Sequence, residues 1–152
     1  MRLCKGTHSF FMAEAIKEAR KGLRQGGIPI GAVLVRNGCI ISRGHNRRVQ
    51  KGSPILHAEM DCFANAGRIS ASGYRNCVLY STLSPCDMCS GAALLFKIPV
   101  IVIGENSTFK GPEAYLKKRG VRVIDLDCPA CKEMMRSFIS RNRALWREDI
   151  SV

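Results

Sequence analysis

The stretch CVLYSTLSPCDMCSGAALLF at residues 77–96 decides the fold of this chain. It begins with a β-rich run at residues 77–82 and passes through a turn that contains a proline. From about Asp87 it continues as a helical segment. A strand followed directly by a helix is the repeating unit of layered α/β proteins. The turn also contains Cys86 and Cys89 in the spacing C-x-x-C, so we expect two thiols where the helix begins.

The residues that precede this stretch predict a helix and a hairpin. Apolar side chains recur at helical spacing before the glycine pair at 26–27, at Phe11, Ile16, Ala19 and Leu23. Two β-rich runs, residues 30–35 and 39–44, flank Asn37-Gly38. An Asn-Gly pair between such runs favours a tight antiparallel hairpin, so we expect the sheet to begin here.

Helices and strands alternate along the rest of the chain. We expect a helix from about His57 to Ala66, a strand at 77–82, a helix from about Asp87, a strand at 100–104, a helix at 113–119, a strand at 121–126 and a helix from about Pro129 to Arg141. This alternation predicts an α/β fold in which the later strands are mostly parallel.

Length and composition favour one domain over residues 1–152, because 152 residues with 46% hydrophobic content suffice for one core. The sequence contains neither the roughly 7 to 15 apolar residues of a signal peptide nor the roughly 18 of a membrane span. Eight cysteines lie mostly in strand-like or helix-like segments rather than in a loop-rich scaffold. We therefore expect a cytoplasmic protein with reduced thiols and no membrane partner.

The chain is basic, with 24 Lys and Arg against 12 Asp and Glu and a net charge of +12. Such a balance raises the question of nucleic-acid binding. The positive residues are spread over several groups, among them Arg47, Arg48 and Lys51, and residues 117–119. Charge runs of this kind are more often solvated faces, so a nucleic-acid partner is open but not favoured.

Two short motifs together predict a zinc site. LHAE at 56–59 and SPCDMC at 84–89 match the H-x-E and P-C-x-x-C signature of zinc nucleobase deaminases. His57, Cys86 and Cys89 would supply three ligands of one tetrahedral Zn²⁺, and the fourth position would remain for water. Both ligand groups fall at expected helix starts, where the helix dipole stabilises thiolates.

Glu59 follows the ligand His57 by two residues and is the expected catalytic group. Zinc with two thiolates and one imidazole is formally neutral, so it should acidify water less than a site with three neutral ligands. The metal then needs a helper base. Glu59 would take a proton from the attacking water, pass it to a ring nitrogen and later protonate the departing amine.

Other interpretations of these motifs are a structural zinc site and, for an isolated C-x-x-C, a redox pair. The combination of both motifs on strand-helix units favours catalysis. The second pair, Cys128 and Cys131, has no His or third Cys nearby in sequence, so we interpret it as packing at a helix start.

Beyond these motifs, the chain resembles cytosine deaminases of the fungal type over nearly its whole length. The resemblance rests on GGIPIGAVLV, RGHN, QKGSPILHAE, LYSTLSPCDMCSGA, IVIGEN followed by TFKG, and the tail WREDI. It implies a cytidine-deaminase-like three-layer α/β/α sandwich around a five-stranded mixed sheet, a homodimer, and conversion of cytosine to uracil and ammonia in pyrimidine salvage.

The resemblance also implies a binding site for the base. Asn46 would bind the pyrimidine edge, Asp149 and the carbonyl of Ser84 would hold the amino group, and the N–H of Ala58 would meet the ring carbonyl. Three side chains would pack on the ring, Phe109, Trp146 and Ile30. Without the resemblance, Asn46 could equally be a turn residue, Trp146 reads as core and Asp149 as a solvated charge.

Two features depart from the fungal pattern. Ala58 stands where that pattern has Gly, and Ala is more typical of tRNA adenosine deaminases; its methyl would narrow the pocket or shift the ring. The basic charge balance is also unlike an enzyme for a small base. A tRNA adenosine deaminase is therefore the main alternative, and isocytosine, guanine, a pterin or creatinine are alternative free substrates. The tail Trp146–Ile150 resembles a lid over a free base, so we expect free cytosine, with 5-substituted cytosines as further substrates.

Overall fold

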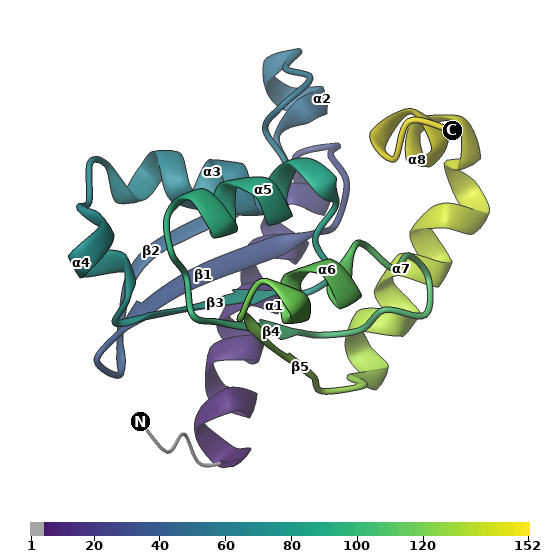
Figure 1. Ribbon diagram of the computed structural model, residues 1–152. Coiled ribbons are helices and arrows are strands. Elements are labelled where there is room, and N and C mark those ends of the chain that lie inside the picture. Colours follow the sequence, from purple (N-terminus) through teal and green to yellow (C-terminus); the bar gives the residue numbers. More distant parts are fainter. Residues whose placement is uncertain (1–4) are drawn as a thin grey trace.

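Five strands form one sheet in the order β2-β1-β3-β4-β5, and helices cover both of its faces (Figure 1). The computed structural model describes the backbone of residues 5–152 and the side chains from His8 onward. The strands are β1 (Gly31–Arg36), β2 (Cys39–His45), β3 (Cys77–Ser81), β4 (Val100–Ile103) and β5 (Arg122–Asp125). The helices are α1 (Lys5–Arg24), α2 (Arg48–Lys51), α3 (Ala58–Ala66), α4 (Ala71–Tyr74), α5 (Asp87–Leu95), α6 (Glu113–Lys118), α7 (Pro129–Arg141) and α8 (Arg143–Asp149).

Strand directions confirm the expected mixed sheet. β1 pairs antiparallel with β2 and also with β3. From β3 onward the pairing is parallel, between β3 and β4 and between β4 and β5. The Asn37-Gly38 hairpin forms as expected, with both residues at positive φ, 51° and 79°. Asn and Gly are the residues that tolerate this backbone conformation.

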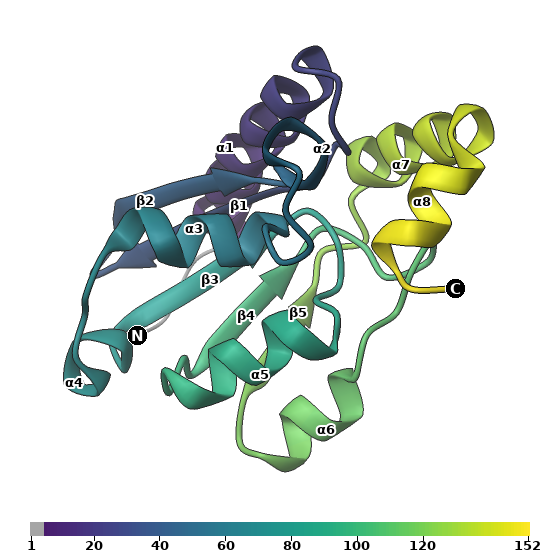
Figure 2. The same cartoon turned by 90° about the horizontal axis from the view of Figure 1, so that it is seen from above.

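Successive side chains of each strand point to opposite faces of the sheet, so they contribute to two cores, one on each face. Leu34, Leu79 and Ile101 belong to the core that includes residues of α3 and α5, whereas Val33, Tyr80 and Val102 belong to the core beneath α1. Figure 2 shows α1 and α7 on one side of the sheet and α3, α5 and α6 on the other. The three-layer α/β/α sandwich is therefore confirmed.

Each long element expected from the sequence is present within a few residues of its expected bounds. Three helices were not expected: the short α2 and α4, and α8, which carries the tail. The helical pattern in the sequence wrongly placed Leu23 on the apolar face of α1. Its side chain is 44% exposed in the last turn. It therefore does not extend the apolar face formed by Phe11 and Ile16.

The fold brings three chain segments to the C-terminal end of β3. Helix α3 begins directly after His57, and α5 begins directly after Cys86. Helix α8 returns from the end of α7 and buries Trp146 and Asp149. In the part of the chain that the structure describes, no helix is long and apolar enough to cross a bilayer. The first four residues of the expected domain, 1–152, lie outside the described part.

Candidate active site

His57, Cys86 and Cys89 come together as a group that fits one metal ion. Their ligand atoms lie within 4.8 Å of one another. The Nδ1 atom of His57 is 3.3 Å from the Sγ atom of Cys86 and 3.8 Å from that of Cys89. A tetrahedral zinc with ordinary bond lengths places such a nitrogen and sulfur about 3.6 Å apart. The side chains therefore fit zinc without rearrangement, and an imidazole with two thiols is a donor set that zinc prefers.

Local electrostatics favour a thiolate at this place. Cys86 caps the N-terminus of α5, and a hydrogen bond from Cys89 together with nearby His57 lowers the pKa of the Cys86 thiol to about 4. Burial works against protonation of His57, but the Cys86 thiolate and the carboxylates of Asp149 and Glu59 outweigh it and raise the pKa of His57 to about 9. The site is thus built to hold a cation next to Cys86.

Glu59 projects from the first turn of α3 into the same place. Its side chain is buried, and Ser81 at the end of β3 donates a hydrogen bond of 2.6 Å to its Oε1 atom. Burial raises the pKa of Glu59. A buried carboxyl group that the Ser81 hydroxyl orients is suited to accepting a proton and releasing it again.

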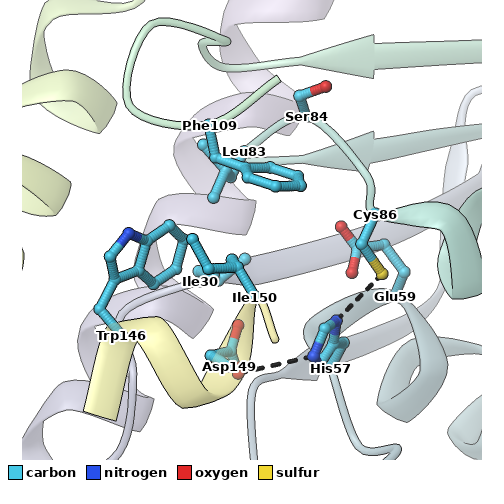
Figure 3. A pocket seen from close by; sticks show the side chains of 10 residues that line it. All are labelled: Ile30, His57, Glu59, Leu83, Ser84, Cys86, Phe109, Trp146, Asp149 and Ile150. Carbon is cyan, nitrogen blue, oxygen red and sulfur yellow. Dashed lines mark hydrogen bonds and ion pairs between the residues drawn. The ribbon is translucent and has the colours of Figure 1, made fainter. Parts of the chain in front are cut away.

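A small pocket adjoins the metal group, and the sequence predicted most of its wall. Its volume is about 20 Å³, room for roughly one water. Figure 3 shows Glu59, Cys86 and His57 on one side and the rings of Phe109 and Trp146 on the other. Ten residues line it: Ile30, His57, Glu59, Leu83, Ser84, Cys86, Phe109, Trp146, Asp149 and Ile150. The sequence analysis did not name Leu83, and it named Ile150 only as the end of the expected lid.

Asp149 of α8 is an ordered part of this pocket rather than a solvated charge. Its Oδ1 atom accepts a hydrogen bond of 2.9 Å from Asn46 Nδ2, lies 3.3 Å from a guanidinium nitrogen of Arg48, and lies 3.5 Å from His57 Nε2. The carboxylate thereby orients the imidazole whose other nitrogen faces the thiols, an arrangement that tunes metal-binding histidines. Trp146 is also buried, and it meets Phe109 edge to face with ring centroids 6.3 Å apart.

Arg48 corrects the interpretation of residues 47–51 as a solvated face. Its side chain is 13% exposed and lies near both carboxylates at the end of α8, Asp149 at 3.3 Å and Glu148 at 3.7 Å. The neighbouring Arg47 lies 3.4 Å from Asp61. Only a structure could reveal these contacts, because about a hundred residues separate Arg48 from its partners on α8.

Two residues expected at the substrate, Asn46 and Ala58, are not among the ten that line the pocket. Asn46 is fully buried, and its amide already bonds Asp149 and the backbone N–H of Arg48. Ala58 is fully buried in the core, so its methyl is not part of the wall. Its backbone N–H lies in the first turn of α3, where N–H groups have no acceptor within the helix.

The loop that carries Phe109 is fixed by two buried carboxylates that the sequence analysis did not single out. Glu105 accepts hydrogen bonds from the backbone and hydroxyl groups of Ser107 and Thr108. Glu113 accepts one of 2.8 Å from the Ser84 hydroxyl, which therefore points away from the pocket in Figure 3. What Ser84 offers to the pocket is its main chain.

The second cysteine pair, Cys128 and Cys131, packs at the start of α7. Cys128 caps α7 and donates its backbone N–H to the Gly104 carbonyl at 2.7 Å. Cys131 is fully buried against Gly104, where a Cβ atom would come within 2.5 Å of its sulfur. Among the described residues, the group of three potential ligands is the one around His57, so the pair at 128 and 131 completes no second metal site.

This fold and site define a zinc-dependent hydrolytic deaminase. Residues 5–105 match the family described as the cytidine and deoxycytidylate deaminase zinc-binding region, and the chain belongs to that family. It is 43% identical over 137 residues to cytosine deaminase of Candida albicans, which covers 90% of this chain and 91% of that protein. It is 35% identical over 151 residues to a tRNA-specific adenosine deaminase of Streptococcus pyogenes, 89% of this chain and 91% of that one. A solved structure of guanine deaminase from Nitrosomonas europaea shares the fold, with a TM-score of 0.73 at 22% identity over 91% of this chain and 87% of that one.

The purified protein should contain one zinc per chain. Cys89→Ser should lose the metal and lower the unfolding temperature, because zinc binding contributes to stability. Cys128→Ser is the matched control, and it should keep the full metal content. Elemental analysis after dialysis measures both variants; two zinc ions per wild-type chain, or loss of zinc from Cys128→Ser, would overturn the assignment of the second pair to packing.

Proposed function

We propose that this deaminase acts on free cytosine, and on 5-substituted cytosines, and releases uracil and ammonia. One observation carries the proposal: α8 buries Asp149 in the pocket, 3.5 Å from the imidazole of His57. A C-terminal helix in this position covers the reacting centre. Its Trp146 gives the pocket an aromatic wall suited to a flat ring.

The size of the pocket supports a small substrate. At about 20 Å³ it does not admit a base while α8 and the Phe109 loop are in place, so binding requires them to move apart and close again. Outside lies an open cavity of about 640 Å³, which Arg48, Lys110 and Asp87 line together with other residues. A polynucleotide would need the same opening, and its backbone would keep α8 from closing again over the base, so the docked position of α8 favours a free base.

The zinc ligands in this proposal are His57, Cys86 and Cys89, and Glu59 is the catalytic residue. Zinc, when bound there, supplies the Lewis acidity that makes water a nucleophile at neutral pH. Glu59 accepts the proton that the attacking water gives up and passes it to the ring nitrogen. It then takes the second proton of the water, from the hydroxyl that has added to the ring carbon, and delivers it to the departing amine, so that ammonia leaves and the ring carbonyl of uracil forms.

Binding contacts follow from the groups that face the pocket. The Oδ1 atom of Asp149 accepts the contacts from Asn46, Arg48 and His57, so its other oxygen is the natural acceptor for an amino group of the base. The carbonyl of Ser84 is the second acceptor, and the N–H of Ala58 meets the ring carbonyl. Asn46 has one amide N–H beyond the one that it gives to Asp149, and it reaches the pyrimidine edge from behind the wall. Phe109, Trp146 and Ile30 enclose the ring.

The alternatives use the same metal chemistry and differ in what the pocket accepts. Deamination of adenosine in tRNA is supported by the similarity to the Streptococcus pyogenes enzyme, but the buried position of α8 favours a free base. Isocytosine, guanine, a pterin or creatinine are other free heterocycles of this class. A single hydrogen-bond contact can redirect the choice among them.

The remaining parts of the proposal concern the context of the enzyme. We infer one deaminase domain over residues 1–152, a homodimer, and a cytoplasmic role in pyrimidine salvage. Free thiols on the seven cysteines of the described part support a reducing compartment. The 71% exposed side chain of Leu95, at the end of α5, supports a subunit contact on that helix.

A panel of free bases tests the substrate class. Zinc-loaded protein should release ammonia from cytosine and 5-methylcytosine, and much more slowly from isocytosine and guanine. Asn46 and the N–H of Ala58 suit the adjacent ring N–H and carbonyl of cytosine, whereas isocytosine has a C–H beside its carbonyl and guanine has a second ring. Ammonia is measured by a coupled assay in each case. Faster release from guanine than from cytosine would replace the pyrimidine proposal with a purine one.

A further inference from the structure

Basic side chains gather at the end of the sheet opposite the active site. At this end β1 stops and the parallel strands begin: Arg36 pairs with Cys77, and Val78 aligns with Val100 and then Arg122. The chain connections located here are the β1–β2 turn and the segments that lead into β3, β4 and β5. The cations that they and the end of α6 carry are Arg36, Arg68, Arg75, Lys97, Lys117, Lys118, Arg119 and Arg122. We call this set the basic end.

No carboxylate accompanies these eight cations. The connecting segments, residues 67–76, 96–99 and 117–122, contain neither Asp nor Glu. The nearest acidic residues along α6 and β5 are Glu113 and Asp125, which lie at the other ends of those elements. Seven of the eight cations are exposed, and within residues 8–152 none of them forms an ion pair. The net charge of +12 is thus concentrated rather than spread.

Helix dipoles account for only part of this charge. Helices α3, α5 and α6 end on this side, and a helix C-terminus carries roughly −0.5 of an elementary charge, which favours neighbouring cations. Three such ends neutralise about one and a half charges of the eight. The positive charges that remain repel one another, and this repulsion destabilises the fold. An anion bound at the basic end would reduce it.

A concave site lies at the centre of the basic end. Its cavity has a volume of about 240 Å³, and Arg75, Lys97 and Arg119 lie on its rim. Its floor is apolar, with Ile98 and Val121 buried beneath the rim. A cationic rim around an apolar floor suits a ligand that carries phosphates together with flat or apolar groups.

An aromatic ring stands beside this cavity. Tyr115 is 50% exposed, and the guanidinium carbon of Arg119 lies 5.6 Å from its ring centroid. The same guanidinium donates a hydrogen bond of 2.7 Å to the Tyr115 hydroxyl, which holds both groups in place. Exposed aromatic and arginine planes next to cations are the elements with which proteins bind single-stranded nucleic acid.

We propose that the basic end is a binding surface for the phosphodiester backbone of single-stranded RNA, with one nucleotide seated over the apolar floor between Arg75, Lys97 and Arg119. Eight cations along one end of the sheet exceed what a mononucleotide could neutralise, so the partner is a polymer. The surface is separate from catalysis. A strand of five residues spans about 15 Å, and the full sheet lies between this surface and Glu59. The inference therefore holds whichever base the enzyme deaminates.

Charge reversal tests this proposal. The triple variant Arg75→Glu/Lys97→Glu/Arg119→Glu is compared with Lys21→Glu/Arg136→Glu/Arg141→Glu, which changes net charge equally at exposed positions of α1 and α7. Binding of a labelled oligouridylate to the zinc-loaded protein is measured by fluorescence anisotropy over a range of salt concentrations. The first variant should lose at least about tenfold in affinity, and its slope of log K against log salt should fall by about two, as expected for three lost phosphate contacts on a single strand. The control should stay closer to wild type, and both variants should deaminate at the wild-type rate.

Several outcomes would overturn the proposal. The wild-type protein could fail to bind at low salt, or the two variants could lose affinity equally, which would indicate attraction by net charge alone. Inorganic polyphosphate of matched charge could compete as well as RNA does, which would remove the role of the apolar floor and of Tyr115. Vesicles with anionic headgroups could bind in a variant-sensitive way while oligouridylate does not, which would assign the surface to membranes. Circular dichroism of each variant confirms that it is folded.

Discussion

Glu59→Gln is expected to lower the turnover of cytosine by at least the roughly 10²- to 10⁴-fold that general acid-base catalysis contributes. Gln retains the size of the side chain and can still accept the hydrogen bond from Ser81, so the fold and the zinc content should not change. It cannot accept a proton from water and deliver it to the base. Single-turnover measurement with zinc-loaded protein isolates the chemical step from binding and release.

Ser81→Ala is the companion variant. It leaves the carboxylate in place but removes the 2.6 Å hydrogen bond that orients it, so we expect an intermediate loss of turnover. Both variants should contain as much zinc as the wild type. Near-normal turnover of zinc-loaded Glu59→Gln would mean that another group moves the protons, and the proposed mechanism would be wrong.

Removal of the tail should have the second large effect. A chain that ends at Arg143 lacks Trp146 and Asp149, so it loses the aromatic wall, the acceptor for the amino group and the cover that excludes water. Deamination of free cytosine should nearly disappear even with zinc in excess. Excess zinc is needed because Asp149 also orients His57, and loss of such a contact weakens metal binding.

Adjacent carboxylates on α8 provide a matched pair that does not disturb the fold. Asp149→Asn should lower kcat/KM by a factor that corresponds to on the order of 1 to 3 kcal/mol, because the buried polar groups that now contact the carboxylate are left poorly satisfied. Glu148→Gln changes a side chain that is 68% exposed and lies 3.7 Å from Arg48, so it should be close to wild type. Equal effects of the two substitutions, or full activity of the truncated chain, would contradict the role of the tail as a lid over a free base.

The sequence predicted the sheet, the longer helices and the metal group because these follow from local signals. Asn37-Gly38 dictates its own hairpin, and apolar runs between turns dictate strands. His57, Cys86 and Cys89 were found because two short motifs, H-x-E and P-C-x-x-C, match the signature of zinc nucleobase deaminases. That prediction needed no long-range contact.

Long-range contacts explain what the sequence did not reveal. Arg48 was interpreted as a solvated cation because its partners Glu148 and Asp149 are about a hundred residues away. Asn46 was expected to bind the pyrimidine edge, and the sequence did not reveal that its buried amide also donates a hydrogen bond to Asp149. Without the family resemblance, Trp146 would have been assigned to the core and Asp149 to solvent. No local sequence pattern indicates that this segment folds back over the metal group.

The most direct test of the central claim is a parallel incubation of zinc-loaded protein with free cytosine and with an anticodon stem-loop RNA that carries a wobble adenosine. Uracil, ammonia and inosine are quantified by chromatography and a coupled assay, with Glu59→Gln as the background. The account predicts uracil and ammonia in equal amounts from cytosine and no inosine from the RNA. Inosine in the RNA together with intact cytosine would contradict it.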